Sequence, residues 1–213
     1  MKDKEKLRNI LERMENLYAA VDAWTDSMKI QIKTPCEKEC TYCCHQLVTA
    51  SIPEALMAMR RVPASFNKEI PRLEREVMLL SQPDASNRKW FVMDIPCVFL
   101  KERLCSIYPD RPVACRTQLS GEETSDKCMN NGQVQRLRLV NSRAMLKKSI
   151  DEAQRINKYT GLPWGSYPFQ VALLYAWEII TGGLNKFVQR MGNKTFEQEI
   201  ETMLFWAQLE TRP

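Results

Sequence analysis

The sequence predicts a mainly α-helical protein with one small β-hairpin. Apolar residues recur at intervals of three and four over most of the chain, as expected for amphipathic helices. Aromatic and β-branched residues gather in one stretch only, around residues 90–112. Four of the eight cysteines lie within residues 36–44, a density that calls for a common chemical role. We therefore expect a helical domain organised around a cysteine-ligated metal centre.

Length and composition are those of an ordinary globular protein. The chain has 213 residues, of which 44% are hydrophobic and 27% charged, and its net charge is +5. This length suffices for a buried core, so the cysteines are not needed merely to hold a very small scaffold together. Acidic and basic residues are interspersed, so the modest positive charge gives little reason to expect nucleic-acid binding. We expect a single domain over residues 1–213, with an N-terminal helix (1–33), a cysteine-rich core (34–130) and C-terminal helices (131–213).

No segment has the pattern of a membrane span or an export signal. The first residues alternate charged and apolar side chains and lack the continuous apolar stretch of a signal peptide. The most apolar segment, residues 169–180, contains Gln170 and Glu178, and it is shorter than the roughly 20 residues that cross a bilayer. We therefore expect a buried core helix there, no membrane partner, and a cytoplasmic protein with reduced thiols.

The N-terminal half of the chain predicts three helices. Residues 7–28 carry an uninterrupted apolar stripe, which we expect to pack on the rest of the protein. A second helix is expected over residues 51–61, where Ser51, Pro53 and Glu54 give a capping box with proline in the first turn. A third is expected over residues 66–82, with Pro71 bending it or marking its true start. Residues 82–89 are expected to form a loop.

The second half predicts one hairpin and then further helices. The apolar segments 97–100 and 104–108 flank a polar turn, which predicts the hairpin around residues 101–103. A helix is expected from residue 134 to Gly161, and another over residues 169–180 with a stop at Gly182 and Gly183. Between them, residues 162–168 are expected to form a turn. A last helix is expected over residues 195–210, with Thr195 as its cap.

The first cysteine cluster consists of Cys36, Cys40, Cys43 and Cys44. Thr34, Pro35 and Glu37 before it have the pattern of a capping box, which predicts a helix from Pro35. At about 100° per residue, the four thiols of this helix would share one face, and His45 would point the opposite way. The first and last thiols would be roughly 12 Å apart along the axis, which is too far for one tetrahedral zinc. Either the segment breaks, or the thiols bind more than one metal atom.

The remaining cysteines are Cys97, Cys105, Cys115 and Cys128. Their wide spacing suits ligands that are brought together by folding rather than by local sequence. They bracket the predicted hairpin and the loops after it. Arg111 and Arg116 flank Cys115, and they either offset the negative charge of the thiolates or form ordinary surface salt bridges.

Metal binding is the favoured explanation of these cysteines, and three alternatives are kept beside it. Disulfides would need an oxidising compartment, of which the chain gives no sign. A thioredoxin-like redox pair at Cys40 and Cys43 would need a βαβ pattern around it. Incidental core cysteines would not be expected to place four thiols within nine residues.

The cysteine pattern also resembles that of a known family. The segment CEKECTYCC, followed by PCVFLKERLCSIYPDRPVACR, is similar to the YkgJ-type cysteine cluster proteins, the CxxCxxCC family of zinc or iron chelators. The resemblance covers roughly residues 34–128. Related cysteine clusters occur in flagellin lysine methylases, which favours an iron–sulfur centre. The resemblance implies that the metal ligands are Cys36, Cys40, Cys43, Cys44, Cys97, Cys105, Cys115 and Cys128.

The sequence therefore predicts a metal-binding protein that holds iron, in ionic form or in an iron–sulfur cluster, or zinc. We favour iron slightly, because adjacent thiols suit a centre of several metal atoms. Two alternative functions are kept: an iron–sulfur-dependent redox or methyl-transfer enzyme, and a zinc-stabilised interaction module. The enzyme would use C-terminal aromatic residues that core packing explains more simply, namely Trp164, Tyr167, Phe169, Tyr175 and Trp177. A module that binds nucleic acid would use the basic residues Arg136, Arg138, Arg143, Lys147 and Lys148. No catalytic residue or protein partner follows from the sequence.

Overall fold

A computed structural model of the chain describes residues 2–32, 34, 36, 40–82, 87–119 and 142–192. In these residues the structure is mainly helical and contains two small antiparallel sheets, which confirms the predicted fold class. Within the same residues, no helix is long and apolar enough to span a membrane. Cys128, the start of the helix expected from residue 134 and the helix expected over residues 195–210 lie outside the described part of the chain.

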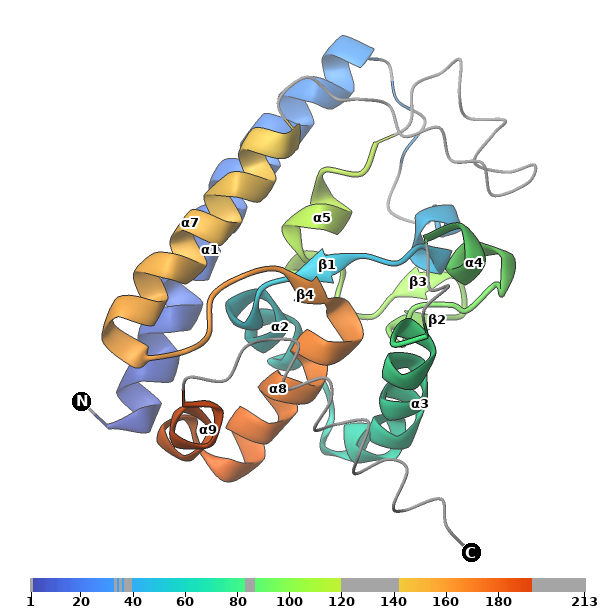
Figure 1. The fold of residues 1–213 in the computed structure, drawn as a ribbon. Coiled ribbons are helices and arrows are strands. Elements are labelled where there is room, and N and C mark those ends of the chain that lie inside the picture. The colour runs from blue at the N-terminus through green and yellow to red at the C-terminus, as the bar shows by residue number, and fades with distance from the viewer. Residues whose placement is uncertain are drawn as a thin grey trace, which may run out of the picture.

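The N-terminal helix α1 (Asp3–Ile32) lies alongside α7 (Ser142–Thr160), and together they form one side of the molecule (Figure 1). The predicted stripe is confirmed, because Ile10, Met14 and Val21 of α1 are fully buried. Helix α7 ends at the predicted place. Gly161 follows it with a φ of +79°, a left-handed conformation that glycine adopts without strain.

Helix α2 (Ile52–Met59) is capped as the sequence predicts. Ser51 Oγ accepts a hydrogen bond from Glu54 N at 3.4 Å, and the Glu54 carboxylate accepts one from Ser51 N at 2.8 Å. Its other oxygen accepts a hydrogen bond of 2.8 Å from Val113 N, at the start of α5 (Val113–Arg116). Every residue of α2 is buried. This helix is therefore the centre of the core, and its cap also fastens α5.

Helices α3, α8 and α9 complete the core around α2. The 3₁₀ helix η2 (Ala64–Glu69) leads into α3 (Ile70–Leu80), so Pro71 marks the true start of that helix. Helix α8 (Phe169–Gly182) is the predicted buried helix, and it packs against α2 and α3. The glycines after it were expected to stop this helix, and α8 does end at Gly182. A helix that the sequence did not predict, α9 (Leu184–Met191), follows at once and buries Phe187 in the core.

Two expectations for the connecting segments are wrong. The loop expected over residues 82–89 is wrong at residues 87–89, which begin α4 (Asn87–Val92), a helix in which Trp90 is buried. Residues 83–86 lie outside the described part of the chain. Packing of Trp90 thus overrides the β-propensity of the residues around it. The turn expected over residues 162–168 contains strand β4 (Tyr167–Pro168), which pairs antiparallel with β1 (Thr49–Ala50). Strands of two residues are too short to produce an alternating pattern in the sequence.

The predicted hairpin is confirmed. Strand β2 (Leu100–Lys101) pairs antiparallel with β3 (Leu104–Cys105) across the two-residue turn Glu102–Arg103. Both turn residues have positive φ angles, 47° and 66°, as in the type I′ turns that asparagine and glycine usually form. Holding residues with a β-carbon in this conformation costs roughly 1–2 kcal/mol each. The turn beside Cys105 is therefore strained.

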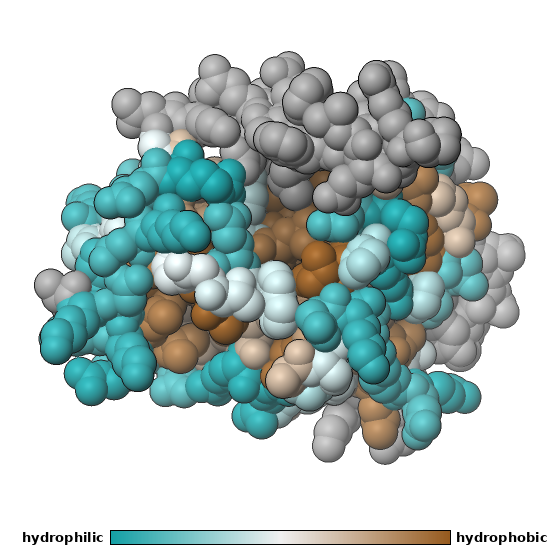
Figure 2. Space-filling model, turned by 90° about the horizontal axis from the view of Figure 1, so that it is seen from below, coloured by the Kyte–Doolittle hydropathy of each residue, from teal (hydrophilic) through white to brown (hydrophobic). Residues whose placement is uncertain are grey.

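Large hydrophobic side chains that are exposed lie on several different elements of the described structure. They include Ile30 on α1, Val92 on α4, Leu104 on β3 and Ile180 on α8. The face seen from below Figure 1 is hydrophilic over much of its periphery, with hydrophobic residues in a recess at its middle (Figure 2). Scattered apolar residues of this kind are ordinary and do not by themselves identify a docking surface.

The substitution Glu54→Gln is expected to lower the free energy of unfolding by about 1–3 kcal/mol, because an amide leaves one of the buried donors at Ser51 or Val113 unpaired. Urea denaturation under reducing conditions measures the change. Glu12→Gln, at an exposed position on α1, is the control and should change the free energy by less than about 0.5 kcal/mol. Equal losses in the two variants would contradict the role assigned to Glu54.

The double substitution Glu102→Asn and Arg103→Gly is expected to raise the free energy of unfolding by about 1 kcal/mol or more. Asparagine and glycine adopt the left-handed turn conformation with less strain. The same denaturation experiment, at matched metal content, checks this. Glu102→Ala keeps the β-carbon and should not stabilise the protein. A double variant no more stable than Glu102→Ala would show that the turn is not strained.

Candidate metal centre

The two cysteine segments are joined by a main-chain hydrogen bond of 2.8 Å from Cys97 N to Cys44 O. Cys43 and Cys44 lie in the one-turn 3₁₀ helix η1 (Tyr42–His45). Cys105 lies on strand β3, and Cys115 lies in α5. Segments far apart in the sequence therefore converge, at the end of the molecule where Figure 1 shows the hairpin and α4.

One cavity collects most of the thiols. The cysteines that line it are Cys40, Cys43, Cys44, Cys97, Cys105 and Cys115. Its volume is about 70 Å³, several times the roughly 10–15 Å³ that one water molecule requires. Helices α3 and α8 contribute Leu73, Glu76, Phe169, Gln170 and Leu173 to the same lining. The fold thus surrounds one space with sulfur atoms on some sides and with two core helices on others.

The helix expected from Pro35 is wrong. Thr34, Cys36 and Cys40 lie outside any helix, and among the described residues after Ile32 helical geometry is first seen in η1. Thr34 Oγ1 accepts a hydrogen bond of 3.1 Å from Cys36 N, which is a local turn contact rather than a helix cap. The segment therefore breaks, the first of the two outcomes that the cysteine spacing allowed. Cys36 is not among the described residues that line the cavity.

His45 is likewise absent from the described residues that line the cavity, although the helix from which its direction was predicted is not formed at Cys36 or Cys40. Its Nδ1 lies 2.7 Å from Oδ1 of Asp94, a contact that becomes an ion pair when the imidazole is protonated. Asp94 has a φ of +51°, a conformation that aspartate adopts more readily than most residues. The contact connects η1 to the segment that follows α4.

Burial and mutual proximity raise the pKa values of four of the cavity thiols, those of Cys43, Cys97, Cys105 and Cys115. The hydrogen bond with Cys44 raises the pKa of Cys43, and burial adds to this effect. Burial raises the pKa of Cys97 to about 12, and it raises the pKa values of Cys105 and Cys115 as well. Thiols in such surroundings stay protonated at neutral pH unless a positive charge compensates the thiolate. A bound metal ion supplies that charge.

Arg111 is a positive charge that acts on the thiols. It lines the cavity, and its charge opposes the rise in the pKa values of Cys43, Cys105 and Cys115. The guanidinium lies over the ring of Tyr108, 3.9 Å from its centroid. Of the two roles predicted for Arg111 and Arg116, the position of Arg111 agrees with compensation of the negative charge of the thiolates.

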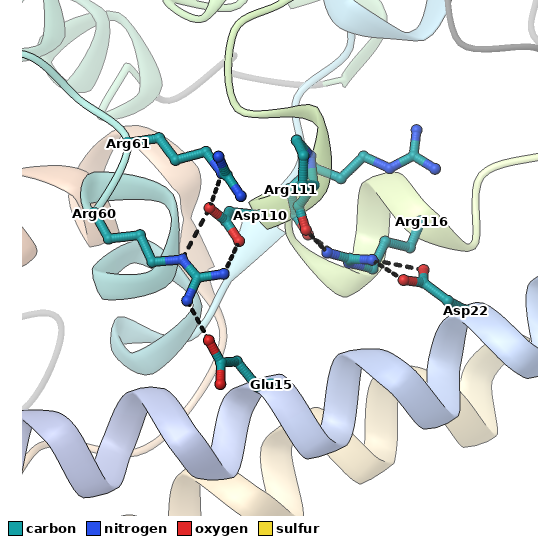
Figure 3. A network of polar contacts seen from close by, with 8 residues as sticks. Glu15, Asp22, Arg60, Arg61, Asp110, Arg111 and Arg116 are labelled. Atoms are coloured by element: carbon teal, nitrogen blue, oxygen red, sulfur yellow. Dashed lines mark hydrogen bonds and ion pairs between the residues drawn. The ribbon is translucent and has the colours of Figure 1, made fainter.

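Arg116 forms a salt bridge instead, in which the Arg116 side chain is buried and the Asp22 side chain is half-exposed. Its guanidinium binds both carboxylate oxygens of Asp22 on α1, at 2.6 and 2.5 Å (Figure 3). Its Nε donates a hydrogen bond of 2.8 Å to the main-chain oxygen of Arg111. The guanidinium also lies 3.9 Å from the centroid of the Tyr18 ring. Arg116 therefore fastens α5 to α1.

Asp110 fastens the other end of the same segment. It is fully buried, and its two carboxylate oxygens accept hydrogen bonds of 2.9 and 2.6 Å from Arg60. Arg61 also binds this carboxylate, and Arg60 reaches Glu15 on α1 (Figure 3). The bond to Asp110 raises the pKa of Arg60. These contacts hold residues 110–116 against α1 and α2. We call them the ionic clamp, formed by Asp110 with Arg60 and Arg61 and by Arg116 with Asp22.

The thiols do not form a ready-made site for one ion. Within the residues that the structure describes, no group of three or more Cys, His, Asp or Glu side chains is placed to hold a metal ion. No disulfide joins the described cysteines. Sulfur donors nevertheless suit zinc and iron, and a centre of several metal atoms spans a wider ring of thiols than a single tetrahedral ion.

The helical side of the cavity could not be foreseen from the cysteine pattern. Glu76 is buried and accepts a hydrogen bond of 2.8 Å from Arg72 Nε. Gln170 lies near the start of α8, and its Oε1 is buried without a hydrogen bond in the described structure. One indication was present in the sequence, because Gln170 is a polar residue within the apolar segment 169–180. This pattern marks an unusual position but does not predict that the cysteines lie beside it.

A comparison with protein families agrees with the cysteine pattern. Residues 35–132 match the CxxCxxCC family, whose description reads "Putative zinc- or iron-chelating domain". No curated protein and no solved structure matches the chain. The matched region contains every cysteine of the chain, whereas α1, α7, α8 and α9 lie outside it.

The substitution Asp110→Asn is expected to lower the free energy of unfolding by about 1–3 kcal/mol, because the buried amide loses the charge-assisted hydrogen bonds from Arg60 and Arg61 and brings a buried donor without a partner. Urea denaturation measures the loss. Asp151→Asn breaks an exposed pair with Lys147 on α7 and should cost less than about 1 kcal/mol. If Asp110→Asn cost no more than this control, the clamp would not stabilise the fold.

Proposed function

Because residues 35–132 carry a CxxCxxCC domain, we propose that this chain binds iron or zinc through its cysteines. The observation that carries the proposal is the cavity lined by six cysteines from separate segments of the chain. Sulfur ligands select these soft or borderline metals over hard ions such as magnesium. Cys36 and Cys128 complete the proposed set of eight ligands.

We favour iron in a sulfur-bridged cluster over zinc. A structural zinc site closes four ligands around one ion, and no such group is preformed in the described residues. A centre of several metal atoms would use more of the six cavity thiols than one tetrahedral ion can. Such a cluster, when bound, would supply electron transfer or activation of a substrate.

The residues of the chain prepare this site in three ways. The hydrogen bond from Cys97 N to Cys44 O sets the two cysteine segments against each other. The ionic clamp holds the segment that carries Cys115. Arg111 adds a positive charge, which lowers the electrostatic cost of gathering several thiolates.

A cytoplasmic location belongs to the same proposal. Thiols that bind metal must be kept from oxidising to disulfides, which the cytoplasm does and an export compartment does not. We propose a metal ion or cluster, rather than a membrane or nucleic acid, as the partner of the chain.

Protein purified without oxygen is expected to be brown and to contain iron with acid-labile sulfide. Elemental analysis, a sulfide assay and the visible absorption spectrum measure this. Colourless protein with about two zinc ions per chain would favour the zinc-stabilised module instead, and a chelator should then unfold it. Protein that holds neither metal, even after anaerobic reconstitution, would overturn the proposal.

Two variants connect the metal to the cavity. Cys97→Ser and Cys115→Ser are each expected to lose most of the bound metal, because both thiols line the cavity. Ser106→Ala changes an exposed residue next to Cys105 and should retain it. Full metal content in both cysteine variants would place the site elsewhere in the chain.

A further inference from the structure

Two residues that line the thiol cavity each contain a buried polar atom without a hydrogen bond in the described structure. These atoms are Oε1 of Gln170 and Nε of Arg111. The first is an acceptor and the second a donor. Five other buried side-chain atoms of the described residues also lack a hydrogen bond, so it is the position of these two at one cavity that indicates a partner outside the protein.

Apart from Gln170 and Glu76, the helical side of the cavity is apolar. It is lined by Leu73, Phe169 and Leu173, and Val48 lies beside them. Phe169 N donates a hydrogen bond of 3.0 Å to Val48 O, and β4 pairs with β1 just before α8 begins. Gln170 therefore projects from a fixed helix start that follows directly on a strand pair. Such a position suits recognition of a ligand better than a surface loop does.

The charges around the cavity favour a neutral ligand. Arg111 would repel a cation and Glu76 would repel an anion, and burying an ion without a matching partner is costly. A hydroxyl or a primary amide carries a donor for Gln170 Oε1 and an acceptor for Arg111 Nε on one functional group. The apolar side chains from α3 and α8 would cover the rest of such a molecule.

We propose that this cavity also binds a small neutral organic molecule, with an apolar body and a hydroxyl or primary amide that Gln170 and Arg111 recognise beside the cysteines. The proposal goes beyond metal binding and does not depend on which metal the thiols hold. A purely structural metal site is closed by protein ligands and needs no such wall. The inferred site makes α8, which lies outside the family match, part of the functional centre.

Ligand-observed NMR with propionamide and butan-2-one tests this inference on the full chain, after its metal content has been measured. The two probes have nearly the same shape, but only propionamide donates hydrogen bonds. The unsubstituted chain is expected to bind propionamide about tenfold more tightly. Gln170→Leu should remove this preference. Gln189→Leu, the same change at an exposed position on α9, should keep it.

Methyl chemical shifts of Leu73 and Leu173 in the unsubstituted chain locate the bound probe, so the test stands even if Gln170→Leu fails to fold. Shifts of both methyl groups support the proposed site. No binding of propionamide, equal affinity for the two probes, or an undiminished preference in folded Gln170→Leu would overturn it. Elemental analysis reports on the metal separately. A chain without metal can therefore still show the amide preference, and a chain with metal can lack it.

Discussion

The burial of Asp110 and Arg116 is the constraint on which the cysteine cavity depends. The segment between them contains only the 3₁₀ helix η3 (Tyr108–Asp110) and the four-residue α5. Elements this short cannot hold their own position through local hydrogen bonds. Two buried charges fix the segment instead, because Arg116 is paired with Asp22 on α1 and Asp110 with Arg60, the residue that follows α2. A buried ion pair is costly to break, because the charge left behind remains out of water. The places of Arg111 and Cys115 at the cavity follow from these two pairs.

Glu54 fastens the same segment a third time and shows how local and long-range structure combine here. One oxygen of its carboxylate completes the capping box of α2, and the other accepts the hydrogen bond from Val113 N. The spacing of Ser51 and Glu54 predicts the cap, because a capping box is a contact within four residues. The bond to Val113 joins residues 59 positions apart, and no local pattern contains it. The start of α2 was therefore predictable, and its connection to the cysteine site was not.

The difference between local contacts and contacts of distant residues also explains which helices and strands the sequence predicts. Helices α1 and α8 follow from apolar periodicity sustained over several turns, and the hairpin follows from two apolar segments around a polar turn. Helix α4 and the pairing of β1 with β4 depend on what surrounds them, so their residues carry no clear pattern. The capping pattern at Thr34 was misleading for a related reason. A few matching residues permit a helix start, but they cannot ensure one where the chain turns back toward a shared cavity. The spacing of the cysteines indicated a shared site, and its helical wall became visible only through the fold.

The balance of charge in the cavity suggests how metal and ligand can share it. Burial raises the pKa values of Cys97 and Cys115, and Arg111 alone cannot compensate several thiolates. Binding of a metal would therefore displace protons from the thiols and draw the sulfur atoms inward. The ionic clamp and the β1–β4 pair restrain the surrounding backbone, so this contraction would fall mainly on cysteine side chains. The wall formed by α3 and α8 would then keep its shape, with the Gln170 amide still in need of a hydrogen-bond donor. On this argument, loading the thiols with metal defines one side of a ligand site whose other side is already built.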